Sequence, residues 1–182
     1  MPVTTRTTTD VLAGTWVIDT TRATVAFSGR TSALMPKLEA WFGGVEGAVT
    51  VPAQREQLGG GDLEVLVDVR TVGTRRKSWD DVLRTLDPFE SAQHPYAAYR
   101  SREVVWRGDR VTIDGTLTLR GVTRSVPLQA TYSGDDLDGR MRVQAHGQVD
   151  RQEFGIRTDV PCLAALTPRR MSLDIDLELV RL

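Results

Sequence analysis

Hydrophobic and polar residues alternate along most of the chain, which is the pattern of β-strands with one buried and one solvated face. The alternation is interrupted by short segments rich in glycine and aspartate, which are typical of turns. One segment, residues 34–42, is aromatic and less regular. After a short lead-in at residues 16–19, the alternating segments are residues 23–28, 45–51, 63–70, 99–105, 111–119, 126–132, 141–149 and 173–179.

These segments predict about eight strands that are joined mostly in sequence order, with turns at Gly108-Asp109, Gly121-Val122 and residues 134–139. Such a meander either leaves two sheet edges or closes into a barrel. Closure is favoured because a long unpaired edge invites aggregation. The predicted fold is therefore all-β, an extended antiparallel β-barrel. A barrel of about eight strands is either filled by side chains or holds one small ligand.

A short helical insert near residues 78–93 interrupts the strands. Ser78 and Asp81 have the spacing of an acidic capping box. Asp87-Pro88 is expected to end the helix, and residues 89–94 to form a second short turn. The apolar residues Trp79, Val82, Leu83 and Leu86 follow at helical spacing, so one face of the insert should cover or line an end of the barrel.

Composition adds few constraints. The chain has 182 residues, 40% of them hydrophobic and 26% charged, which suits one soluble domain at residues 14–182 after a flexible tail at 1–13. A net charge of −1 argues against nucleic acid or an anionic membrane surface as partner, and a homodimer is left open. Cys162 is alone and fits a small buried hydrophobe better than a nucleophile.

The N-terminal segment has no apolar signal-peptide core. The apolar tract at residues 160–166 is far shorter than the roughly 20 residues of a membrane helix. We therefore expect a cytoplasmic protein without a membrane span.

Six sequence motifs stand out along the chain, namely WVID (16–19), VAF (25–27), TxxxxxDxxLxxxDPF (74–89), HPYAAY (94–99), DGTLTLRGVTRSVPL (114–128) and DRQEFGI (150–156). With these motifs the chain resembles the YceI-like family over roughly residues 14–182, and the hairpin GTLTLRGVTRSVPL is the most specific of them. The resemblance implies a lipocalin-like barrel whose apolar lumen holds a polyisoprenoid or an isoprenoid quinone, with no enzymatic activity and no required cofactor.

The chain departs from this family at three positions that are commonly histidine. They are Arg22, Thr31 and Val82 here. The replacements predict fewer polar groups for a ligand's head or for the barrel mouth.

The remaining titratable residues favour structural roles. His94 is expected to position a turn, and His146 to lie on the solvated face of its strand, so no metal pair is predicted. The aspartates of residues 134–139 suit a turn. On the last strand, Asp174, Asp176 and Glu178 alternate, and cross-strand pairs with Arg140, Arg142 and Gln144 are favoured over a cation site.

We therefore predict non-enzymatic binding, carriage or sequestration of a hydrophobic isoprenoid-like ligand. The alternatives are a stress-response or protein-interaction module with a filled barrel and, more weakly, a lipid-acting hydrolase or isomerase. Head-group candidates are Arg75, Arg76, Lys77 and Asp80, although the basic run also suits a solvated surface. The predicted lumen residues are Phe27, Phe42, Val65, Val67, Trp79, Leu83, Phe89, Tyr99, Leu117, Leu119, Val143, Phe154, Leu173 and Ile175.

Overall fold

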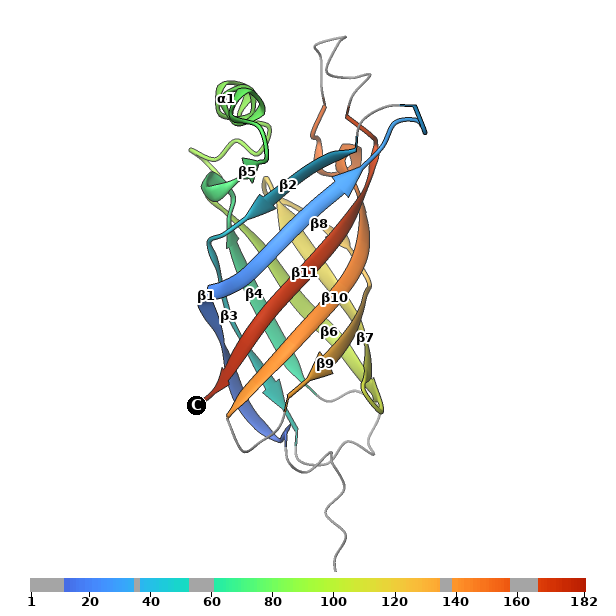
Figure 1. Cartoon of the computed structure of the whole chain (residues 1–182). Helices are drawn as coiled ribbons and strands as arrows, with labels where there is room; N and C mark the ends of the chain where they lie inside the picture. The colour runs from blue at the N-terminus through green and yellow to red at the C-terminus, as the bar shows by residue number, and fades with distance from the viewer. Residues whose placement is uncertain (1–11, 35–36, 53–60, 135–138, 158–166) are drawn as a thin grey trace, which may run out of the picture.

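Eight antiparallel strands close into a barrel in the computed structural model, which describes residues 12–34, 37–52, 61–134, 139–157 and 167–182 (Figure 1). The last strand pairs with the first, which confirms the predicted closure. Neighbours around the ring are β1 (Gly14–Gly29), β3 (Val45–Val51), β4 (Asp62–Asp68), β6 (Tyr96–Arg107), β7 (Arg110–Leu119), β9 (Leu128–Ser133), β10 (Arg140–Asp150) and β11 (Arg170–Arg181).

Shorter elements lie mostly at the end of the barrel that is uppermost in Figure 1. These are β2 (Leu38–Phe42), η2 (Val69–Thr71), β5 (Gly73–Thr74), α1 (Lys77–Leu86), β8 (Val122–Ser125) and η3 (Arg151–Phe154). We call this the helix end, because α1 lies above it. The opposite end carries the start of β1 and the end of β11.

The first strand is longer than predicted. The lead-in at residues 16–19 and the strand at 23–28 are both parts of β1, and its pairing with β11 shifts register between Ile18 and Ala23. The polar run between them hid this continuity in the sequence, because an irregularity in a strand interrupts the period of two. One edge of β1 pairs first with β3 and then, further along, with β2.

Trp16 anchors the packing at the end opposite α1. Its side chain is fully buried, and its indole N–H donates to the carbonyl of Leu12 at 2.9 Å. Leu12 is itself only 2% exposed and belongs to the core. The predicted flexible tail at residues 1–13 is therefore wrong for Leu12. Met141 and Leu179 are also fully buried.

The hairpin after β7 turns one residue earlier than predicted. Arg120 (φ 53°) and Gly121 (φ 71°) occupy the turn, and both take the left-handed conformation that a two-residue hairpin of this kind requires. His94 packs beside Gly121, within 3.1 Å of where a Cβ would stand. The segment predicted as one strand at residues 126–132 is shorter in the structure. Val126 and Pro127 connect β8 to β9, which begins at Leu128.

Charged residues of β10 and β11 form ion pairs on the outer face, as predicted. Arg140 pairs with Glu178, and the Arg142 Nε donates to Asp176 at 2.8 Å. The arginine contacts hold the pKa values of both carboxyls below their usual range. His146, on the solvated face as expected, lies 2.7 Å from Asp174.

The helical insert forms, but its N-terminus differs from the prediction. Helix α1 begins at Lys77, Arg76 is its N-cap without a side-chain hydrogen bond, and the Ser78–Asp81 capping box is absent. Instead, the Asp80 carboxylate accepts from the Thr74 backbone N–H at 2.6 Å and from its hydroxyl at 2.7 Å. The helix ends at Leu86, as predicted from Asp87-Pro88, and turns follow at residues 88–89 and 91–93.

Candidate functional site

A cavity of about 420 Å³ lies inside the barrel and is lined by side chains from all eight of its strands and from α1. This volume falls within the range of about 300–1,000 Å³ that is usual for small-molecule pockets. Along β11, every second residue from Met171 to Leu179 lines it. Eight residue steps correspond to roughly 26 Å of strand, so the cavity is elongated.

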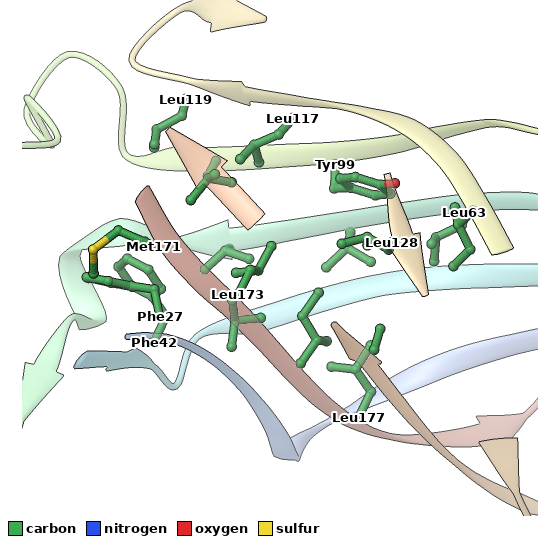
Figure 2. A pocket seen from close by; sticks show the side chains of 18 of the residues that line it. Phe27, Phe42, Leu63, Tyr99, Leu117, Leu119, Leu128, Met171, Leu173 and Leu177 are labelled. Carbon is green, nitrogen blue, oxygen red and sulfur yellow. The ribbon is translucent and has the colours of Figure 1, made fainter. Parts of the chain in front are cut away.

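The walls of the cavity are almost wholly aliphatic and aromatic (Figure 2). Leu117 and Leu119 of β7 and Leu173 and Leu177 of β11 are among the side chains drawn around the hollow. All fourteen predicted lumen residues line the cavity. The lining residues that our list omitted include Val25, Leu63, Trp106, Val111, Ile113, Leu128, Met141, Val149, Met171, Leu177 and Leu179, most of which the alternation had already placed on the inner face.

Three phenylalanines and the helix α1 define the helix end of the cavity. The Phe27, Phe42 and Phe89 rings form a cluster with centroid separations of 5.5 to 6.3 Å, and Figure 2 shows Met171 beside two of them. The predicted apolar face of α1 lines the cavity at this end, although no residue of α1 is buried. A lightly packed amphipathic helix therefore covers a hollow interior.

Tyr99 places a polar group within the apolar wall and satisfies it internally. Its hydroxyl donates to the Val126 carbonyl at 2.9 Å. The phenol ring lies across Gly115, where any Cβ would overlap the hydroxyl. Burial, reinforced by the charge of Asp114, raises the pKa of Tyr99 well above its usual value near 10.

This raised pKa predicts a loss of stability in alkali. Above about pH 10 the unfolded chain releases the phenol proton while the folded chain keeps it, so the free energy of unfolding falls by up to about 1.4 kcal/mol per pH unit. Urea denaturation between pH 9 and 11 should show this slope, and Tyr99→Phe should flatten it. An equally steep slope in Tyr99→Phe would contradict the assignment.

Polar groups lie at the two ends of the cavity. At the helix end these are Arg151, Arg157 and Thr167, and at the opposite end Thr50 and Asp62. Our sequence reasoning missed both arginines. The available signal was weak: Arg151 directly follows β10, where that strand reaches the barrel rim, and Arg157 comes six residues later.

The four predicted head-group residues are absent from the cavity wall. Arg75 is exposed and lies 3.8 Å from Glu39, while Lys77 pairs with Asp81 at 3.4 Å along the helix. Asp80 is used in closing the loop before α1, and its hydrogen bonds to Thr74 lower its pKa. Arg76 is exposed as well.

The three positions where the resemblance implies histidine have different surroundings. Arg22 is on the outer face, paired with Glu178 at 3.1 Å, and Thr31 is exposed beyond the end of β1. Only Val82 lines the cavity. Our expectation of lost head-group contacts is therefore wrong for Arg22, because its side chain does not face the lumen.

Some predictions concern residues outside the described part, namely Cys162, the apolar tract at 160–166 and the aspartates at 135, 136 and 138. Within the described ranges, no three His, Cys, Asp or Glu side chains gather as metal ligands would. In the same ranges, no helix has the length and apolar character needed to cross a bilayer.

A closed antiparallel barrel of eight strands around an elongated apolar cavity has the architecture of the small barrels that are wide enough to hold one ligand. The chain belongs to the YceI-like family, whose domain model matches residues 16–179. This confirms the resemblance noted in the sequence.

Two curated bacterial proteins are similar to this chain over about half of its length. The chain is 35% identical over 102 residues to Protein YceI of Escherichia coli, an alignment covering 54% of this chain and 53% of that protein. A UPF0312 protein of Pectobacterium atrosepticum is 36% identical over 102 residues, which also cover 54% of this chain and 53% of that protein. The aligned part of the chain thus spans about half the length of these relatives.

Solved structures share the fold at lower identity. BcnA of Burkholderia cenocepacia superposes with a TM-score of 0.75 at 17% identity, over 88% of this chain and 98% of that one. A polyisoprenoid binding domain from Saccharophagus degradans gives a TM-score of 0.70 at 16% identity, over 92% and 98% of the two chains. At these identities the similarity shows the fold alone.

Proposed function

We propose that this protein binds a hydrophobic isoprenoid-like molecule, such as a polyisoprenoid or an isoprenoid quinone, within the barrel and carries or sequesters it. The hollow apolar lumen is the observation that carries the proposal. The fold shared with a polyisoprenoid binding domain supports it.

Apolar burial is sufficient to hold such a guest. A buried methylene contributes about 0.8 kcal/mol, so a five-carbon isoprene unit contributes on the order of 3 kcal/mol gross. A few units reach micromolar affinity after the entropic cost of ordering the chain. Polar contacts then choose the head and set its orientation.

The proposed role is non-enzymatic. A hydrolase or isomerase would need a lumen group that exchanges protons near neutral pH. Among the described lining residues, the strongly shifted group is Tyr99, whose pKa is raised further from neutrality and whose proton is committed to Val126. These properties suit a wall residue and not a general acid or base.

Lipid extraction followed by mass spectrometry of the protein from its native host tests the proposal. We expect a prenyl-chain lipid in the extract. Titration of delipidated protein with a short-chain isoprenoid quinone should quench the tryptophan fluorescence, since Trp79 and Trp106 both line the cavity. A protein that yields no lipid and shows no quenching would overturn the proposal and favour a protein-interaction module.

A further inference from the structure

We propose that the cavity selects an amphiphile with an anionic head group, a carboxylate or a phosphate, which lies at the helix end against Arg157 with its tail toward Asp62. This inference rests on the proposed function and specifies its ligand class. Carboxylate and phosphate oxygens are the partners that guanidinium groups bind most strongly.

Arg151 supplies a fixed positive charge beneath this end. Its guanidinium donates to the carbonyls of Ile156 at 2.7 Å, Pro168 at 3.0 Å and Thr167 at 3.3 Å. Within the described ranges no carboxylate lies within ion-pair distance of it, because the neighbouring Asp150 pairs with Arg169 at 2.6 Å. The described hydrogen bonds of this guanidinium go to neutral carbonyls, and Asp150 acts on it through its charge at longer range. A partly buried cation with such partners favours a further anion nearby.

Arg157 supplies a second, solvent-exposed cation. It lines the cavity, is exposed at the rim, and makes no hydrogen bond or ion pair within the part of the chain that the structure describes. Arg157 is tied to Arg151 through its neighbour, because the Arg151 side chain donates to the carbonyl of Ile156, which directly precedes Arg157. The two cations thus lie on one short segment, and no described residue competes with a ligand for the donors of Arg157.

The charges at the two ends of the cavity give the ligand a direction. At the helix end the charged lining residues of the described chain are both cations, whereas Asp62 lies at the start of β4, at the other end. An anionic head is attracted to the first end and repelled from the second. A neutral isoprenoid would gain nothing from this asymmetry.

Matched probe pairs test the inference. Geranylgeranyl monophosphate is compared with geranylgeraniol, and palmitate with 1-hexadecanol, by tryptophan fluorescence titration in low salt. We expect at least one anionic probe to bind on the order of tenfold tighter than its alcohol, as a charge-assisted hydrogen bond at a wet rim provides. The two pairs distinguish a phosphate from a carboxylate head. The preference should shrink at high salt.

Variants assign the preference to a residue. Arg157→Gln should remove the difference in affinity between each acid and its alcohol, whereas Arg76→Gln, a change at an exposed arginine outside the cavity wall, should retain that difference. Equal affinities for acid and alcohol in the natural sequence would overturn the inference while sustaining the proposed function. A preference that persists in Arg157→Gln would also overturn it. Failure of all four probes to bind would count against the proposed function itself.

Discussion

A Val143→Trp variant is expected to bind a prenyl ligand about 100-fold more weakly than the natural protein while keeping its fold. Val143 of β10 lines the cavity and is only half-buried, so space remains in front of it. An indole there would occupy the volume of the ligand tail. Displacing about four methylenes costs roughly 3 kcal/mol, which is about 100-fold in affinity.

The measurement is a quinone titration of both proteins, with thermal unfolding as a check on the fold. Gln148→Trp is the matched control, because Gln148 is exposed on the same strand and is not part of the cavity wall. The control should bind normally. Unchanged binding by a folded Val143→Trp protein would show that the ligand lies elsewhere.

Trp16→Ala is expected to produce a large loss of stability, about 3–5 kcal/mol. The substitution removes a fully buried indole, leaves the Leu12 carbonyl without its donor, and removes the ring beneath the Arg181 guanidinium, which lies 5.8 Å from the ring centroid. For a chain of this size, such a loss lowers the melting temperature by roughly 6–20 °C.

Two further variants serve as controls for Trp16→Ala. Trp79→Ala makes the same change on α1, which has no buried residue, so it should lower the melting temperature much less. Trp16→Phe keeps a ring in the core but loses the indole N–H, and it should fall between the two. Similar melting temperatures for Trp16→Ala and Trp79→Ala would contradict the packing described here.

The alternation of apolar and polar residues correctly predicted which side chains line the inner wall of the barrel. Leu173 and Ile175 alternate with Asp174 and Asp176, and the structure places the first pair on the cavity and the second pair outside. This agreement arises because a strand in a closed barrel has one face inside and one outside. Predictions failed where local rules compete, as at Ser78, where the loop contact between Thr74 and Asp80 replaced the capping box.

The charged residues of the cavity wall were the hardest to predict. Arg75, Arg76 and Lys77 form a conspicuous basic run, yet they project from the insert and do not line the cavity. Arg151 and Arg157 line it, but in the sequence they are two isolated arginines in DRQEFGIR. The direction of a side chain at a barrel rim depends on how the strand ends and the next turn begins, which no periodicity records.

By itself, the sequence determined that the chain is an all-β meander, which residues face inward, and where one amphipathic helix interrupts the strands. These properties follow from the alternation of apolar and polar side chains along each strand. Only the tertiary structure decided that the interior is hollow, because the volume inside a barrel depends on how inward side chains from opposite walls meet. It also decided which charges stand at each end, since strands distant in sequence bring those residues together.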